Sequence, residues 1–271
     1  MTIELRDARL TIGRRPLLSG LDARIERGEF LALIGPNGVG KTTLLRALAG
    51  LHPLESGTIL LNGMTLDRMK PSARARQVAL VTGDEVFLDS LLVSDVVSIG
   101  RFAYHRWWEW QSRQSDAAAV ARGLQEVQMT GLSDRLFSTL SSGERQRVWI
   151  ALGLAQETPL LLLDEPTSHL DVHVAHTILA LLRRLSRAGT TIVCALHDFN
   201  EAAIYADRVG LLGNGRLVML APPDEVLANL VLDDIYGIAM ERVRLCGGGM
   251  RVFVKDVEPA PVERPSREPN A

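Results

Sequence analysis

Residues 35–42 combine glycines, a lysine and a threonine in an order that can bind the phosphates of a nucleotide. They read Gly-Pro-Asn-Gly-Val-Gly-Lys-Thr, which matches the phosphate-loop pattern G-x-x-x-x-G-K-[ST]. The glycines let backbone N–H groups turn toward the β-phosphate, Lys41 can bridge the β- and γ-phosphates, and the Thr42 hydroxyl can bind Mg²⁺. The residues expected to contact the nucleotide here are Gly35, Pro36, Asn37, Gly38, Val39, Gly40, Lys41, Thr42 and Thr43.

Two adjacent carboxylates, Asp164 and Glu165, follow the apolar run Leu160–Leu163. A carboxylate at the end of a buried strand beside a phosphate loop is placed to hold hydrated Mg²⁺, so we assign that role to Asp164. Glu165 is then the candidate that polarises the water attacking the γ-phosphate. Acidic residues after a strand are more often a solvated strand end or a helix cap. Only their combination with the phosphate loop favours the catalytic interpretation.

Three apolar runs without polar alternation must position these side chains: Phe30–Ile34, Leu160–Leu163 and Thr191–Leu196. Strands that are covered on both faces of a parallel sheet have this pattern. The phosphate loop directly follows the first run, and a helical pattern follows the loop, which is the context that the motif requires. After Asp171 an apolar stripe at helical spacing predicts a further helix, which Gly189 ends. We therefore predict an α/β fold of the P-loop (RecA-like) type with a mostly parallel sheet.

Other segments add to this core. The pairs Asn62-Gly63 and Asn214-Gly215 lie between apolar runs and predict β-hairpins, so an antiparallel β part should accompany the parallel sheet. Between about residues 88 and 158 strand-like runs disappear and helical patterns dominate, which indicates a helical insertion.

The composition is that of an ordinary globular protein. The 271 residues are 46% hydrophobic and carry 30 basic and 32 acidic side chains, a balance that excludes a polybasic nucleic-acid binder. Two cysteines, Cys194 and Cys246, are too few for a disulfide framework and indicate a reducing compartment. No apolar run approaches the roughly 20 residues that cross a bilayer, and the start does not resemble a signal peptide. We expect neither export nor a membrane span.

The segment Leu140–Arg147 is a further motif, and together with the motifs above it resembles a known protein family. Taken alone, Leu-Ser-Ser-Gly-Glu-Arg-Gln-Arg is only a helix start capped by Ser142. Together with the phosphate loop and the acidic pair, the set resembles the nucleotide-binding subunit of ABC transporters. Leu140–Arg147 is similar to the LSGGQ signature of that family, Ser168–Asp171 to its D-loop and His197 to its switch histidine. A lone histidine after a strand is usually structural, so the assignment of His197 depends on the neighbouring motifs.

The resemblance covers about residues 3–240 and implies a site shared by two chains. In that family two subunits pair head to tail, and each ATP is held between the phosphate loop of one and the signature of the other. The Ser141 hydroxyl and the Gly143 N–H would face the γ-phosphate. The implied signature contacts are Ser141, Ser142, Gly143 and Glu144. The implied catalytic residues are Lys41, Glu165 and His197, and the metal ligands are Thr42 and Asp164.

The family also implies cofactors, partners and a location. These are ATP and Mg²⁺, a second copy of the chain, integral membrane permease subunits and, indirectly, a periplasmic or extracellular solute-binding protein, with no nucleic acid. The chain would lie peripherally at the cytoplasmic face of the membrane. Residues 1–240 would form the ABC ATPase domain and 241–256 a C-terminal extension, while 257–271, rich in proline and charge, would be a disordered tail.

Within the family the sequence is most similar to the ATPases of iron-siderophore, haem and cobalamin importers. The similar stretches are Val97–Tyr104 in the helical region and, after the core, Gly215–Val218 followed by Ala221–Leu227. One alternative is a soluble ABC ATPase of nucleic-acid repair or translation, but such proteins carry coiled-coil insertions or two ATPase halves, which this chain lacks. Another is a weakly hydrolytic ATP-binding regulator, which departures from the family pattern suggest.

Those departures lie at three positions. Ile12 stands where most members have an aromatic residue that stacks on adenine, so only apolar contact is retained. Gly83 stands where the family has a glutamine that touches Mg²⁺ and the attacking water. Asp84 and Glu85 follow; Asp84 is a candidate substitute metal ligand, and a plain polar loop is the alternative. Ser142 replaces a glycine of the signature and adds a hydroxymethyl group.

A cluster of tryptophans lies in the helical region, at Trp107, Trp108 and Trp110. Aromatic density of this kind occurs at buried anchors of interfaces, and this region faces the membrane partner in the family. A small satellite core within the insertion is an equally good interpretation.

Overall fold

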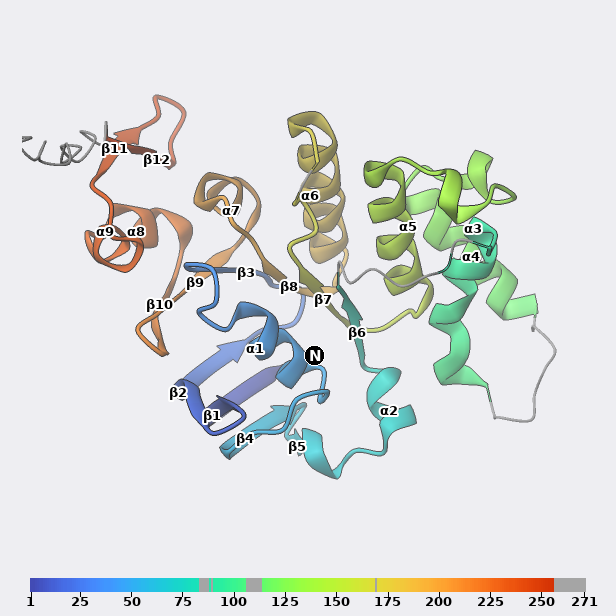
Figure 1. The fold of residues 1–271 in the computed structure, drawn as a ribbon, viewed down its shortest axis with the longest axis horizontal. Helices are drawn as coiled ribbons and strands as arrows, with labels where there is room; N and C mark the ends of the chain where they lie inside the picture. Colours follow the sequence, from blue (N-terminus) through green and yellow to red (C-terminus); the bar gives the residue numbers. More distant parts are fainter. Residues whose placement is uncertain (83–87, 89, 106–113, 169, 256–271) are drawn as a thin grey trace, which may run out of the picture.

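The computed structural model describes residues 1–82, 88, 90–105, 114–168 and 170–255 (Figure 1). Its centre is a six-stranded sheet in the order β10-β9-β3-β8-β7-β6. The strands are β3 (Phe30–Ile34), β6 (Val78–Val81), β7 (Leu160–Asp164), β8 (Thr191–Ala195), β9 (Arg208–Gly213) and β10 (Arg216–Ala221). All neighbours pair in parallel except β9 and β10. The predicted α/β class and its mostly parallel sheet are therefore confirmed.

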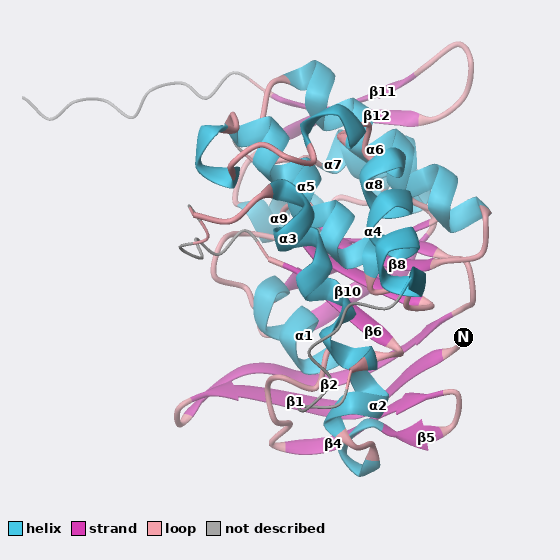
Figure 2. Ribbon diagram, turned by 90° about the vertical axis from the view of Figure 1, so that its right-hand side faces the viewer, coloured by secondary structure: helices cyan, strands magenta, loops and turns pink. Residues whose placement is uncertain are grey.

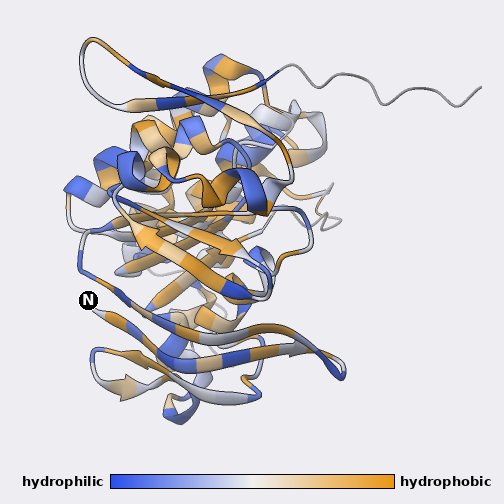
Figure 3. Ribbon diagram, turned by 90° about the vertical axis from the view of Figure 1, so that its left-hand side faces the viewer, coloured by the Kyte–Doolittle hydropathy of each residue, from blue (hydrophilic) through white to orange (hydrophobic). Residues whose placement is uncertain are grey.

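The central sheet is buried on both faces, which explains why its strands show no polar alternation. In β3, Phe30, Ala32 and Ile34 belong to one core, whereas Leu31 and Leu33 belong to a second core on the opposite face. The strands β7 and β8 alternate between the two cores in the same way. In Figure 3 the strands between the upper helices and the lower antiparallel sheet are predominantly hydrophobic.

A second, antiparallel sheet lies beside the first, in the order β2-β1-β4-β5. Its strands are β1 (Ile3–Ile12), β2 (Arg15–Ile25), β4 (Ser56–Leu61) and β5 (Met64–Thr65). Both Asn-Gly pairs form the predicted hairpin turns, since Asn62-Gly63 joins β4 to β5, Asn214-Gly215 joins β9 to β10, and all four residues have positive φ. Figure 2 shows the two sheets as separate layers.

The α-helices are α1 (Lys41–Leu48), α2 (Pro71–Ala75), α3 (Val93–Ser98), α4 (Gln114–Glu126), α5 (Ser142–Ala155), α6 (Val172–Arg187), α7 (Phe199–Tyr205), α8 (Pro223–Ala228) and α9 (Val231–Tyr236). Helices α5, α6, α7 and α8 cover the central sheet on the side away from the antiparallel sheet, and α1 lies between the two sheets (Figures 1 and 2). Short 3₁₀ segments are η1 (Leu66–Arg68), η2 (Ile99–Tyr104), η3 (Thr130–Leu132) and η4 (Phe137–Thr139). The predicted helical insertion corresponds to α3, η2, α4 and α5. The helix predicted after Asp171 is α6, and Asp171 caps it by accepting from Val174 N–H.

The start of α5 corrects one prediction. Ser141, and not Ser142, is the N-cap: its backbone is extended and its hydroxyl oxygen accepts from the Glu144 N–H. The Glu144 carboxylate in turn accepts from the Ser141 N–H at 2.8 Å, which completes a capping box. A capping box needs a Glu three residues after the cap, and that spacing selects Ser141.

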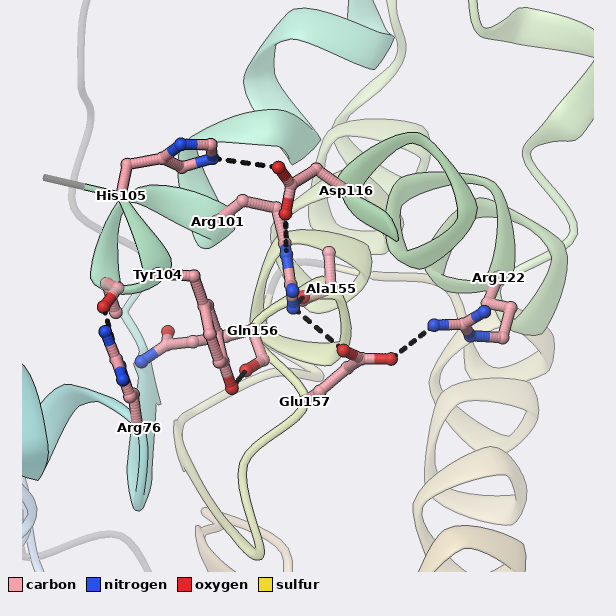
Figure 4. Close-up of polar contacts among 10 residues, drawn as sticks. Arg76, Arg101, Tyr104, His105, Asp116, Arg122, Ala155, Gln156 and Glu157 are labelled. Carbon is pink, nitrogen blue, oxygen red and sulfur yellow. Dashed lines mark hydrogen bonds and ion pairs between the residues drawn. The ribbon is translucent and has the colours of Figure 1, made fainter. Parts of the chain in front are cut away.

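The far end of α5 is held by a buried ion-pair cluster (Figure 4). The Arg101 side chain is only 7% exposed; its Nε donates to Asp116 at 2.9 Å, and its Nη1 donates to Ala155 O at 2.7 Å and Glu157 at 2.9 Å. The Tyr104 hydroxyl donates to Gln156 O at 2.8 Å. Because helix ends leave carbonyls without partners, these two side chains of η2 terminate α5 and join it to the rest of the insertion.

The C-terminal part forms a separate antiparallel hairpin of β11 (Met240–Arg244) and β12 (Met250–Val254). The expected start of a C-terminal extension at residue 241 falls within its first strand. The expected tail at 257–271 lies outside the described residues. In the part of the chain that is described, no helix is both long and apolar enough to cross a membrane.

We predict that Arg101→Met lowers the free energy of unfolding by about 3–5 kcal/mol, since it removes a buried guanidinium while Asp116 stays buried. Chemical denaturation measures the change. The matched control is Arg122→Met, which removes the 59% exposed partner of the same Glu157 and should change stability by under about 1 kcal/mol. Equal losses in the two variants would contradict a structural role for the buried cluster.

Candidate active site

A cleft of about 340 Å³ lies where the phosphate loop meets the ends of β7 and β8. Because β3, β7 and β8 are parallel, the residues that follow them meet at one edge of the sheet. The lining residues are Ile12, Leu17, Asn37, Gly38, Gly40, Lys41, Thr42, Thr43, Glu165 and His197. The structure thus brings together the three candidate catalytic side chains and most of the predicted phosphate loop. Gly35, Pro36 and Val39 belong to the loop but do not line the cleft.

Two glycines explain the backbone of the loop. Gly40 is the N-cap of α1 and has φ of +112°, a conformation that L side chains rarely adopt. Gly35 has φ of +150°, and a Cβ there would lie 2.4 Å from the Leu212 carbonyl oxygen. The loop therefore keeps its N-terminal helix end open toward the cleft only with glycine at these positions.

Lys41 is buried inside the loop, with 5% of its surface exposed. Its Nζ donates to Gly35 O at 2.8 Å and Pro36 O at 3.3 Å. Burial lowers the pKa of Lys41, while the nearby Glu165 and Asp164 carboxylates raise it. A desolvated ammonium at the base of a cleft is a strong attractor for an anion such as a phosphate.

Asp164 and Thr42 form an oxygen-rich pair below the cleft. Burial raises the pKa of Asp164, and a hydrogen bond from the Thr42 side chain lowers it. The Asp164 Oδ1 is buried and has no hydrogen-bond partner among the residues that the structure describes. A hydroxyl and a carboxylate with one unpartnered oxygen fit Mg²⁺, which prefers oxygen ligands and keeps several waters. Across the described ranges no group of three or more His, Cys, Asp or Glu could hold a metal ion by itself.

Glu165 follows β7, and its carboxylate contacts His197, which follows β8. Its Oε2 lies 2.5 Å from His197 Nε2, and it accepts from the Ser168 hydroxyl at 3.3 Å. The backbone of Glu165 has φ of +51°, which is uncommon for a residue with a side chain. Strained backbone of this kind costs about 1–3 kcal/mol and clusters at functional sites. The carboxylate is therefore held in the cleft by a strained turn and two partners.

The signature residues lie elsewhere. None of Ser141, Ser142, Gly143 and Glu144, all of them described, lines the cleft. The Ser141 hydroxyl donates to Glu144 at 2.9 Å, and the hydrogen bonds from Ser141 lower the pKa of Glu144. Ser141 and Ser142 are exposed at the start of α5. The signature-like segment and the cleft are therefore separate surfaces of the chain.

Ile12 lies at the cleft as predicted, and it is 58% exposed. Leu17 lines the same cleft and was missed, because it reaches the site only through the register of the β1–β2 hairpin. Gly83, Asp84 and Glu85 lie outside the described residues, as do Trp107, Trp108 and Trp110. The substitute role of Asp84 and both interpretations of the tryptophans stay predictions.

Comparison with known proteins identifies the family to which the chain belongs. The ABC transporter family matches residues 18–168. The hemin import ATP-binding protein HmuV of Streptomyces coelicolor is 41% identical over 233 residues, which are 86% of this chain and 82% of the relative. The chain belongs to the ABC transporter family. It is the ATP-binding subunit, and ATP hydrolysis by this subunit drives transport.

Further relatives agree with this ABC subunit in sequence and in fold. The ferric enterobactin transport ATP-binding protein FepC of Escherichia coli is 36% identical over 241 residues, covering 86% of this chain and 87% of the relative. The structure of cbiO1 from Clostridium perfringens superposes with a TM-score of 0.74 at 28% identity and covers 86% of this chain and 92% of that one. A nucleotide-free ABC cassette at 20% identity has a TM-score of 0.79 over 87% of this chain and 99% of that one, which supports the fold alone.

The raised pKa of Asp164 predicts a conflict between stability and function in the ABC subunit. A carboxyl whose pKa is higher in the folded than in the unfolded chain destabilises the fold when ionised. That penalty is absent below the unfolded value of 3.8 and grows as pH rises through the folded pKa. Asp164→Asn should therefore raise the Tm of the ligand-free protein near neutral pH, but not near about pH 3.5, while it abolishes hydrolysis.

Differential scanning fluorimetry at the two pH values measures this effect. The control is Asp134→Asn at an exposed surface position, which should leave the Tm unchanged at both. A ligand-free Asp164→Asn protein that melts at or below the wild-type temperature near neutral pH would contradict the burial argument.

Proposed function

We propose that this ABC ATPase energises import of haem or an iron-siderophore chelate, through ATP bound between two copies of the chain. Relatives that are 36–41% identical over the aligned residues are named for hemin import, petrobactin import and ferric enterobactin transport. The main support for ATP binding in this cleft is the buried Lys41 ammonium at its base, with Glu165 and His197 lining the same cleft.

In this proposal the side chains at the cleft bind the phosphates, position the attacking water and orient one another. Lys41 exchanges its two carbonyl acceptors for the β- and γ-phosphates and neutralises charge that builds up during phosphoryl transfer. Glu165 polarises the attacking water, and its position is fixed by the strained turn after β7. His197, 2.5 Å from Glu165, contacts the γ-phosphate and orients that carboxylate.

The remaining contacts are with adenine and the metal. Ile12 and Leu17 offer apolar surface to the adenine ring in place of an aromatic stack. Thr42 and Asp164 would hold Mg²⁺, which when bound neutralises phosphate charge. The loop residues Asn37, Gly38, Gly40 and Thr43 face the phosphates from the open end of α1.

A second copy would complete the cleft. The exposed start of α5 carries Ser141 and Gly143, and the positive end of that helix suits the γ-phosphate of an ATP held by the other chain. We therefore propose a head-to-tail homodimer that closes on ATP and opens after hydrolysis, since only a difference in affinity between the two states can drive a partner. Its partners would be permease subunits and, through them, a solute-binding protein, with the ATPase at the cytoplasmic face of the membrane.

The division of the chain follows from this proposal. Residues 1–240 form the ATPase domain, with the helical insertion at about 88–158 carrying the signature. Residues 241–256 are an extension, most of which is the hairpin β11–β12.

Lys41→Ala should abolish tight ATP binding, because it removes the charge that contacts the phosphates, worth about 1.5–3 kcal/mol or more. Isothermal titration with Mg-ATP measures the affinity. Lys70→Ala, on the exposed surface before α2, is the matched control and should bind like wild type. Unchanged affinity in the Lys41 variant would refute the phosphate-loop assignment.

Glu165→Gln should retain ATP and accumulate as a dimer, because the amide keeps the shape of the side chain but polarises water poorly. Turnover should fall by about 10²-fold or more. Gel filtration with Mg-ATP detects the dimer, and Glu201→Gln, a half-buried glutamate of α7 that does not line the cleft, serves as the control. A monomer with wild-type turnover would contradict both the role of Glu165 and the shared site.

A further inference from the structure

The segment that carries His197 is held on its N-terminal side by Leu196, which is buried and whose N–H donates to Leu33 O at 2.9 Å, and it leads into α7 on its C-terminal side. The His197 side chain is 44% exposed, so few packing contacts hold it against Glu165. Its backbone leads directly into α7, whose N-cap Asp198 accepts from the N–H groups of Asn200 and Glu201 at 2.6 and 3.2 Å. The position of His197 therefore depends on where the first turn of α7 is held.

Asn200, in that first turn, is attached to the C-terminal hairpin by a pair of hydrogen bonds. Its Nδ2 donates to Val252 O at 2.9 Å, and its Oδ1 accepts from the Val252 N–H at 3.0 Å. The side-chain amide thus satisfies both backbone groups of one residue of β12, as a neighbouring strand would. Such paired bonds fix orientation as well as distance, because both must be aligned at once.

The hairpin itself is firmly anchored. The Asp224 carboxylate of α8 accepts from Met250 N–H at 2.9 Å, at the start of β12. The guanidinium of Arg242 in β11 pairs with Asp233 and donates to Leu227 O and Asn229 O, both at 2.9 Å. The side chains of Met240, Met250 and Val252 are buried in the main core. The hairpin is therefore a rigid support, not a loose appendage.

The same C-terminal unit also contacts the phosphate loop. The Tyr236 ring at the end of α9 lies edge-on to Phe199, next to Asp198, with ring centroids 5.8 Å apart. Its hydroxyl is buried. Burial raises the pKa of Tyr236 to about 12, opposed by the Gly35 backbone and reinforced by Asp198. The start of the phosphate loop and the start of α7 thus share one neighbour.

We propose that the hairpin β11–β12 is a brace for the switch histidine, and that Asn200 is the positioning residue which sets His197 against Glu165 through its two bonds to Val252. This inference rests on the proposed role of His197 in hydrolysis. A small displacement of a catalytic side chain can lower a rate by up to about 10²-fold, whereas ATP affinity depends on the phosphate loop and should be spared.

The experiment is a double-mutant cycle on the full chain, with steady-state ATP hydrolysis as the readout. Asn200→Ala should lower kcat by about tenfold and leave the KM for ATP within about twofold. In the His197→Ala background the same change should lower kcat by less than about twofold, because the residue it positions is absent. Asn229→Ala, which removes one hydrogen bond to Val231 in the same C-terminal unit, is the matched control and should leave kcat unchanged.

Several outcomes would contradict the proposal that the hairpin positions His197. An equal loss with Asn200→Ala in both backgrounds, or an equal loss with Asn229→Ala, would overturn the brace and indicate general destabilisation. A His197→Ala variant with wild-type kcat would instead overturn the proposed role of His197, and the brace with it. If Asn200→Ala does not fold, Asp224→Ala is the second variant, because it loosens the hairpin from α8. It should lower kcat by a smaller factor in the wild-type background and leave kcat nearly unchanged in the His197→Ala background.

Discussion

Burial of the Lys41 charge is the constraint on which the site depends. An ammonium group that is removed from water needs hydrogen-bond acceptors, because an unpaired buried charge is costly. In this structure the acceptors of Lys41 are the carbonyls of Gly35 and Pro36. Only a loop with glycines at strained positions can turn those carbonyls inward and still leave N–H groups free for phosphate. The parallel strands β7 and β8 then bring Glu165 and His197 to the same edge. The remainder of the fold supports this edge.

In the proposed head-to-tail dimer a single chain would supply only half of each ATP site, and pairing of two chains would then be the step that does work. The cleft holds the phosphate loop, whereas the signature lies at the start of α5, whose far end is tied to η2 by Arg101 and Tyr104. Joining two copies around ATP would therefore also move the helical insertion of each. That insertion lies on the right of the molecule in Figure 1, beside the β6 edge of the central sheet. Closure and opening of the proposed dimer could then be transmitted to a partner protein through the helical insertion itself.

Local patterns predicted the elements, while contacts distant in sequence stayed hidden. Uninterrupted apolar runs indicated β3, β7 and β8 because a sheet buried on both faces tolerates no polar alternation, and the two Asn-Gly pairs required hairpins. The cap of α5 was misplaced by one residue, since the decisive signal was the spacing to Glu144 and not the serine itself. No local pattern could reveal the bonds between Asn200 and Val252 or the approach of Leu17 to the cleft, because they depend on topology and register.

The structure of the wild-type chain with Mg²⁺ and a non-hydrolysable ATP analogue tests the central claim most directly. The account predicts that Lys41 Nζ leaves the carbonyls of Gly35 and Pro36 for the β- and γ-phosphates, and that Ser141 of a second copy faces the γ-phosphate. An analogue bound away from the phosphate loop, with Lys41 still donating to Gly35 and the signature of each copy turned to solvent, would contradict it.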